Sequence, residues 1–491
     1  MGVESALVER FWSSISNRPH PPLEFVGAGT LESRYAVSEF AAAAIATAGL
    51  AAGATVVDRA LADAWFGQAL RPIGWELPSP WDPLAGDYRT ADGWIRLHTN
   101  APHHRLAALL VLGVAERSVP RRGAAIVGQV READIDFAAE RAAERVDVAA
   151  AVAQWNGTDL ETELVDAGGA AAVLRSPADW AAHPQGRALA AEPLIRWTAA
   201  EPDPVLEPAS VVDPASVVER VEPAPVVELV ETKTLVETKT LLETVKVLDL
   251  TRVIAGPVAT RFLAGLGANV LRIDPPDWDE PAIVPEMTLG KRAARANFLD
   301  AGGMRKLRLL IAEADVIVHG YRADALERLG LGDDEIRAIN PGIVDVAINA
   351  YGWSGPWRNR RGFDSLVQMS SGIAFGDVPS PLPVQALDHA TGYLAAAAVL
   401  EGLRRRRETG HGSTARLSLA RTALELLPTP VVERTPVVEP VETNTQTAPV
   451  VELVETPWGP AELLATPLTI NGKPLEWVKP PRPLGSDKPS F

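Results

Sequence analysis

The chain has 491 residues, 47% of them hydrophobic, which is enough for two to four domains with buried cores. It has no cysteine, which excludes disulfides and thiolate metal sites, and its eight histidines do not pair at the helical spacing of a zinc site. The net charge of −16 comes mostly from two repetitive stretches, and nucleic-acid binding has no support because no basic patch with interleaved aromatic residues occurs. No secretory signal and no charge-free apolar window of 18 residues occur, so we expect a cytoplasmic protein without a metal or a membrane span.

Residues 1–200 form the first block, which is rich in alanine and predicts a small α/β domain. WIRLHT (94–99) follows the turn Ala-Asp-Gly and reads as a strand. The segments 140–155 and 159–169 read as two short helices.

Two repetitive stretches, 201–244 and 428–456, contribute −11 of the net charge of −16. The nonapeptide APVVELVET occurs identically at 224–232 and 448–456. Proline every few residues blocks a regular helix, so we interpret both stretches as extended linkers. A partner-binding role for them is the alternative.

Residues 245–427 alternate strand-like and helix-like patterns. Helices are expected over 304–314 and over 392–408, the second ended by Gly410 and Gly412. Strands separated by helices of this length predict βαβ units and a doubly wound parallel sheet. The predicted strands are 245–250, 269–274, 314–320 and 342–352.

The first strand, loop and helix of this block, with a second strand ending in Asp274, also outline a dinucleotide-binding fold. That fold needs three glycines in the first loop, whereas Ala255-Gly256-Pro257 supplies one glycine and a proline without an N–H. NAD or FAD binding is therefore disfavoured. The start of the following helix could still face a phosphate or carboxylate of another ligand.

Seven motifs in a fixed order carry a resemblance to a known family. They include VLDLTRVIAGPVATRFLAGLGANVLRID, LGKRAARANFLD, EADVIVHGYRADALERLGL, INAYGWSGPW, RGFDSLVQMSSG and LDHATGYLAAAAVLEGLRRRRETGHG. They resemble the CaiB/BaiF CoA-transferases (Family III), which include formyl-CoA transferases. The resemblance implies that CoA moves from an acyl-CoA to a carboxylic acid through an aspartyl intermediate. It also implies a homodimer with no permanently bound cofactor.

The nucleophile implied by the resemblance is Asp388, the first residue of a D-x-x-T-G motif. Asp388 also stands just before a predicted helix, where aspartate is a favoured N-cap, and position alone would indicate that role. A helix N-terminus would keep its carboxylate ionised. The neighbouring His389 has no part in this chemistry.

The resemblance also implies contacts with CoA. Basic positions of the family are matched by Lys291, Arg292, Arg328 and Arg361, and the loop near the thioester by Ile254 and Ala255. Each arginine taken singly is equally well a surface charge. Pro275-Pro276 stand where the family has a basic residue, so Arg272 could replace that function. Asp364 matches an acidic position near the site or, alternatively, a structural turn residue.

The first block resembles other parts of the same family. Residues 88–99 and 167–187 resemble its smaller domain, and 38–67 resembles a degenerate copy of 391–424. Setting Phe40 against Leu394 places Arg34 at the position of Asp388, so this copy lacks the acid. The chain thus resembles a fusion of a degenerate half and an intact half, with a tail at 457–491.

Two other functions stay open. An α-methylacyl-CoA racemase shares the fold but needs an acid–base pair, and Gly362-Phe363-Asp364 replaces the G-H-D of that branch. A non-catalytic acyl-CoA-binding relic is favoured by the degenerate half and opposed by the intact Asp388. The acyl donor and acceptor cannot be read from the sequence.

Overall fold

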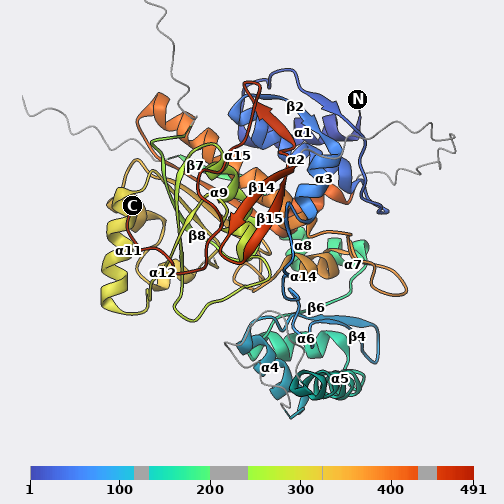
Figure 1. The fold of residues 1–491 in the computed structure, drawn as a ribbon. Helices are drawn as coiled ribbons and strands as arrows, with labels where there is room; N and C mark the ends of the chain where they lie inside the picture. The colour runs from blue at the N-terminus through green and yellow to red at the C-terminus, as the bar shows by residue number, and fades with distance from the viewer. Residues whose placement is uncertain (1, 116–131, 200–241, 323, 429–450) are drawn as a thin grey trace, which may run out of the picture.

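The computed structural model describes residues 2–115, 132–199, 242–322, 324–428 and 451–491 (Figure 1). The greater part of both predicted linkers lies outside these ranges. Within them, no helix combines the length and apolar character needed to cross a membrane.

A seven-stranded sheet forms the centre of the larger domain. Its first six strands are parallel, and the seventh is an antiparallel edge strand from the first block. The parallel strands lie in the order 3-2-1-4-5-6 of their succession along the chain, the order of a doubly wound nucleotide-binding fold. The predicted doubly wound sheet is therefore confirmed. Across the sheet the strands are β10 (Arg292–Arg295), β9 (Asn269–Asp274), β8 (Lys246–Leu250), β11 (Val316–His319), β12 (Val344–Asn349), β13 (Ser413–Ser418) and β7 (Arg196–Ala199).

Helices cover both faces of this sheet because its apolar strands project buried side chains to either side. On one face Val247, Val316 and Val346 pack with α9 (Ala255–Gly265) and α15 (Ala386–Thr409). On the other, Leu248 and Ile317 pack with α11 (Ala301–Glu313) and α13 (Asp333–Ile339). Short helices α10 (Val284–Met287), α12 (Ala325–Arg328), α14 (Asp364–Ser371) and α16 (Leu419–Leu426) complete the domain.

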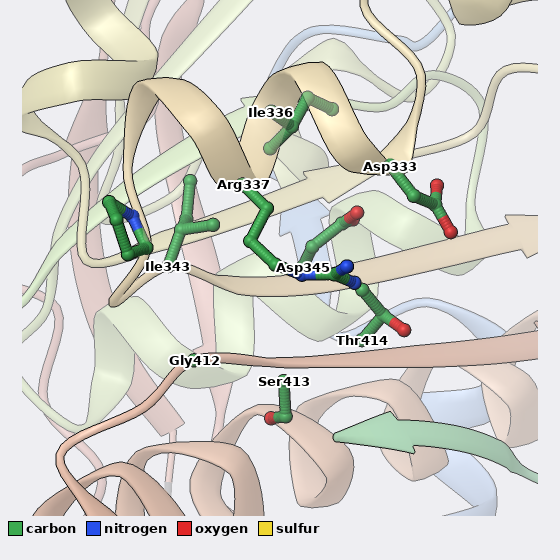
Figure 2. A pocket seen from close by; sticks show the side chains of 9 residues that line it. Asp333, Ile336, Arg337, Ile343, Asp345, Gly412, Ser413 and Thr414 are labelled. Carbon is green, nitrogen blue, oxygen red and sulfur yellow. The ribbon is translucent and has the colours of Figure 1, made fainter. Parts of the chain in front are cut away.

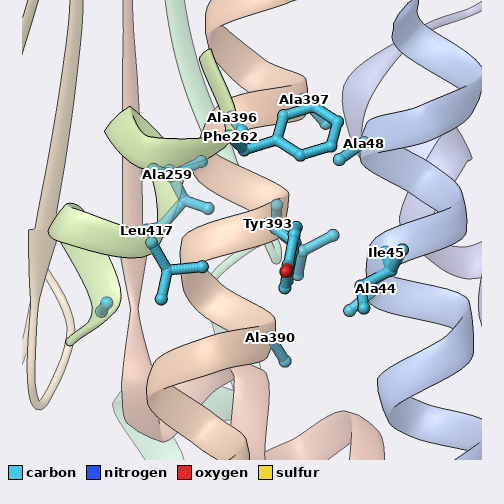
Figure 3. Close-up of a cluster of buried hydrophobic side chains, with 14 of the residues drawn as sticks. Ala44, Ile45, Ala48, Ala259, Phe262, Ala390, Tyr393, Ala396, Ala397 and Leu417 are labelled. Atoms are coloured by element: carbon cyan, nitrogen blue, oxygen red, sulfur yellow. The ribbon is translucent and has the colours of Figure 1, made fainter. Parts of the chain in front are cut away.

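The first block enters the core of the larger domain through α2 (Val37–Ala52), which lies along α15 (Figure 3). Ala44, Ile45 and Ala48 of α2 face Tyr393 and Ala397 of α15, and all five are buried. Alanine at these positions lets the helices approach closely. α2 belongs to the predicted degenerate copy (38–67), and α15 belongs to the intact stretch that it resembles (391–424).

The rest of the N-terminal region pairs with the C-terminal tail. β2 (Ala54–Asp58) lies between β1 (Glu24–Val26) and β16 (Leu468–Ile470), with β17 (Lys473–Pro474) beyond. A second sheet has the order β14 (Val451–Thr456), β15 (Gly459–Leu464), β3 (Leu70–Pro72). α1 (Val3–Ile15) packs on α2, and α3 (Arg59–Gly67) follows β2.

This pairing corrects one predicted boundary. The predicted linker 428–456 includes β14, which forms a regular antiparallel ladder with β15. Val454 of β14 also packs against the core, so this part of the repeat is not a solvated connector. The other block boundaries stay predictions.

The smaller domain lies at the bottom of Figure 1. Its antiparallel sheet consists of β4 (Gly86–Arg89), β5 (Trp94–Leu97) and β6 (Ala171–Val173). The predicted strand 94–99 and both predicted helices are confirmed. The predicted helices 140–155 and 159–169 correspond to α5 (Glu132–Val152) and α6 (Gly157–Asp166). α4 (Pro102–Leu112) precedes them, and α7 (Pro177–Ala182) and α8 (Pro184–Ala191) lead on to β7.

Candidate active site

The strand order places one edge of the sheet at a topological switch point. β8 and β11 are neighbours at this point. From the carboxyl end of β8 the chain continues to β9 on one side, and from that of β11 it continues to β12 on the other side. Ligands of open doubly wound sheets bind at this edge. Ile254 is the N-cap of α9 and Ala255 is its first residue, so both predicted loop contacts lie at the switch point.

The loop that connects β8 to α9 has a constrained backbone. Val253 adopts a φ of +65°, a conformation that a β-branched residue rarely takes. Its N–H donates to Oε2 of Glu280 at 3.0 Å, which helps to hold the turn. Strained residues of this kind concentrate at functional sites.

Gly392, the last residue of the D-x-x-T-G motif, brings α15 against the start of α9. A methyl group on Gly392 would overlap the carbonyl oxygen of Ala255 and approach Cβ of Val258 to 2.9 Å. Asp388 precedes Gly392 by one helical turn, on the same side of α15. Helix packing thus brings Gly392, one turn beyond Asp388, against the start of α9.

Asp388 is the third residue of α15, and Gln385 is the N-cap. The predicted placement of Asp388 before the helix is therefore wrong, because α15 begins at Ala386 rather than near Gly392. Asp388 is 7% exposed and therefore almost entirely buried.

Asp364 performs the capping that was expected of Asp388. It is the first residue of α14, it is completely buried, and its Oδ2 accepts a hydrogen bond from the Asp388 N–H at 2.9 Å. It also accepts from the N–H of Leu387, and its Oδ1 accepts from Nε2 of Gln368. The sequence marks the acid but not this partnership, because 24 residues separate the two aspartates.

Burial raises the pKa of Asp388 well above its usual range, and the nearby negative charge of Asp364 adds to the effect. Burial also raises the pKa of Asp364 to about 6, although its hydrogen bonds to Gln368 and to the start of α15 oppose that shift. The expectation that the helix N-terminus keeps Asp388 ionised is therefore wrong: desolvation outweighs the helix dipole. The two carboxyl groups form a buried pair that retains a proton readily.

His389 points away from this pair. It is 3% exposed and its ring stacks on Phe66 at a centroid distance of 5.1 Å. Burial lowers the pKa of His389 to about 3, so the ring is neutral. It packs between the first block and the larger domain.

Lys291 is completely buried and its ammonium group has three internal acceptors. It donates to Oδ2 of Asp249 at 3.0 Å, to the carbonyl of Pro257 at 2.9 Å and to Oγ1 of Thr260 at 2.6 Å. Burial lowers its pKa to about 8. These contacts join β8 to α9, so Lys291 stabilises the loop between them from the protein interior.

The predicted arginines lie nearer to solvent. Arg292 donates to the carbonyl of Lys488 at 3.4 Å, and Arg328 forms an exposed ion pair with Asp324. Arg361 donates to the carbonyl of Gly168 in the smaller domain at 2.6 Å. Arg328 is thus exposed and Arg292 and Arg361 are partly exposed, whereas Lys291 is buried.

Arg272, the expected substitute cation, is fully buried. Its guanidinium binds Asp274 at 2.9 Å and also pairs with Glu280. Arg252 and Arg322, which follow the carboxyl ends of β8 and β11 by two and three residues, were not predicted. Burial lowers the pKa of Arg361, and the positive charge of Arg322 lowers it further. A basic residue within three positions of each strand end was the signal for both.

A small hollow beside β12 and β13 lies elsewhere on the domain (Figure 2). Both carboxylates that line it, Asp333 and Asp345, are already paired with Arg416, which does not line the hollow, at 2.7 Å in each case. Asp388 does not line it. We assign it no ligand.

The sequence profile of CoA-transferase family III matches residues 242–466, which include all six parallel strands, Asp364 and Asp388. This region belongs to CoA-transferase family III. Mouse succinyl-CoA:glutarate CoA-transferase is 36% identical over 182 residues, 33% of this chain and 42% of the relative. A probable fatty acyl-CoA transferase of Mycobacterium tuberculosis is 30% identical over 196 residues, 36% of this chain and 50% of the relative.

The matched part of the chain thus spans half or less of the length of these CoA-transferases. The crystal structure of a CAIB/BAIF family protein from Brucella suis has 28% sequence identity and a TM-score of 0.36. That match covers 39% of this chain and 56% of the solved one.

Proposed function

We propose that the protein is a CoA-transferase that moves CoA between an acyl-CoA and a carboxylic acid, with Asp388 as the covalent nucleophile. The observation that carries the proposal is the position of Asp388. Asp388 is buried on the first turn of α15, one turn before Gly392, which packs against the start of α9 at the switch point.

The chemistry divides one difficult exchange into four balanced steps. The Asp388 carboxylate attacks the thioester carbonyl, which gives a mixed anhydride and CoA thiolate. The thiolate attacks the aspartyl carbonyl, so the donor acid leaves and an aspartyl-CoA thioester forms. The acceptor carboxylate attacks that thioester and expels the thiolate again. The thiolate then attacks the acceptor's acyl carbon, and the Asp388 carboxylate is restored.

Burial of the carboxyl pair suits these steps. A mixed anhydride hydrolyses if water reaches it, and the 7% exposure of Asp388 limits that access. A carboxylate with a raised pKa is also the stronger nucleophile once it has ionised. The hydrogen bond from the Asp388 N–H to Asp364 fixes the turn that presents the carboxylate.

Groups on both sides of the switch point are proposed to bind CoA. Ile254 and Ala255 face the thioester, while Arg292, Arg328 and Arg361, with Arg322, offer cations to the phosphates. Lys291 keeps the α9 loop in place instead. By analogy with the family, we also infer a cytoplasmic homodimer that holds no permanent cofactor.

Mass spectrometry of the full chain after incubation with a panel of acyl-CoAs tests the proposal. We expect an adduct equal to CoA minus water on Asp388, and none in Asp388→Asn. Loss of an α-deuterium label without an adduct would instead support a racemase. Saturable acyl-CoA binding with neither reaction would support a non-catalytic binding protein.

A further inference from the structure

The segment that joins α14 to α15 leads from Asp364 to Asp388, and the first block holds it. Arg34, in the loop before α2, donates from Nη2 to the carbonyl of Ile373 and from Nη1 to that of Phe375. A planar guanidinium can bridge two carbonyls in this way, whereas a lysine ammonium is a single point of attachment.

Two further contacts from the first block fix the same segment. Nε1 of Trp94 donates to the carbonyl of Asp377 at 3.0 Å. Gly372, with a φ of +84°, packs so closely on Pro177 that a Cβ there would lie 2.8 Å from the proline Cα. The segment is therefore held at its beginning and at its middle.

The segment is also tied directly to the buried carboxyl pair. Gln368 donates to Asp364 through Nε2 and accepts from the N–H of Leu382 through Oε1 at 2.8 Å. A displacement of residues 373–382 would thus reach Asp364, and Asp364 binds the Asp388 N–H.

We propose that Arg34 is a positioning residue for Asp388, an inference that rests on the proposed transferase activity. Arg34 stands at the sequence position that corresponds to Asp388 in the degenerate copy. It is exposed, and no carboxylate of the described residues forms an ion pair with it. Its guanidinium forms its two hydrogen bonds with backbone carbonyls of the α14–α15 segment. The half that lost the acid therefore helps to hold the acid of the other half.

The test compares Arg34→Ala and Arg34→Lys in the full chain. Arg18→Ala is the matched control, since Arg18 is also exposed but pairs with Glu408 at the far end of α15. We expect Arg34→Ala to lower kcat between about tenfold and about a hundredfold with little change in KM, because misplacement of a reacting group costs this much. Arg34→Lys recovers part of the rate, added methylguanidinium recovers part of it in Arg34→Ala, and Arg18→Ala matches wild type.

Hydrogen exchange of the amides in residues 372–388 supplies a readout that does not need activity. We expect faster exchange there in Arg34→Ala, with a melting temperature equal to that of Arg18→Ala. Unchanged exchange, or a kcat within twofold of wild type, would overturn the role of Arg34. Faster exchange in a protein whose wild type forms no aspartyl adduct would overturn the proposed function, and the positioning role with it.

Discussion

Oδ2 of Asp364 accepts a hydrogen bond from the backbone N–H of Asp388 at 2.9 Å, so one buried carboxylate holds the helical turn that carries another. The arrangement has opposite effects on the two properties of a nucleophile. The hydrogen bond fixes the position of Asp388, while the charge of Asp364 makes Asp388 harder to ionise. Substitution of Asp364 can separate these effects.

Asp364→Asn keeps an oxygen acceptor and removes the charge. Because that charge contributes to the raised pKa of Asp388, we expect the rate of acylation to reach its plateau at lower pH than in wild type. The measurement is the single-turnover rate of adduct formation between pH 5 and 9. An unmoved profile would contradict the coupling of the two carboxyl groups.

Asp364→Ala is the companion variant, because it removes the acceptor as well. The N–H groups of Leu387 and Asp388 then lose their partner, and we expect a loss of ~1 kcal/mol in stability, typical of a removed helix cap. Denaturant unfolding measures this loss, and Asp364→Asn should show less of it.

Asp388→Asn should stabilise the fold while it abolishes the reaction. The pKa of Asp388 is higher in the folded chain than in the unfolded one, so the folded state binds the proton more tightly. Its contribution to stability is complete below the unfolded pKa and is lost as pH rises through the folded pKa. An uncharged asparagine avoids that loss, so we expect a gain of ~1 kcal/mol at pH 8 that shrinks at pH 5.

Thermal unfolding at the two pH values measures this gain. The exposed Asp377→Asn is the matched control and should show no pH-dependent gain. A gain for Asp388→Asn that does not depend on pH would disagree with the ionisation argument.

Gly392→Ala tests the contact between α15 and α9. The added methyl group would collide with the Ala255 carbonyl, and overpacking of this kind costs ~1–3 kcal/mol. We also expect lower acylation rates, since the turn of Asp388 would move away from the start of α9. Gly67→Ala is the control, because Gly67 ends α3 with no atom within 4 Å of its added Cβ. Equal stability of the two variants would refute the close approach.

Variants of Lys291 and Arg328 test whether each residue stabilises the fold from inside or binds CoA at the surface. Lys291→Met leaves the buried Asp249 without its ammonium partner, which costs ~3–5 kcal/mol. Arg328→Ala removes an exposed ion pair worth ~0.5 kcal/mol at most, so stability should be nearly unchanged. If Arg328 binds CoA, KM for acyl-CoA rises in Arg328→Ala while kcat is kept. A stable Lys291→Met with a raised KM would reverse the two assignments.

The parallel sheet could be predicted from the sequence because buried strands such as β8 (KVLDL) and β11 (VIVH) are short, mostly apolar runs. The strand β13, with the sequence STARLS, was not predicted, since four of its six side chains are polar although all six residues are buried. β7 was missed because its pairing partner lies more than 200 residues away.

The site shows the same division between local and non-local information. The motif around Asp388 identified the acid, but its place within the helix depends on Asp364, which caps α15 from another element. Lys291 matched a basic position by sequence, and only the packing of β8 on α9 gives it internal partners. Arg34 had no apparent role in the sequence because its two acceptors are backbone carbonyls.

β7 also determines how the protein could be divided. A polypeptide that begins at residue 242 would present the free edge of β13 and the apolar side of α15 to solvent, and open strand edges invite aggregation. The family region is therefore a poor candidate for expression by itself. Two polypeptides cut between residues 200 and 241 and produced together would keep both interfaces, and we expect them to reassemble as a split enzyme.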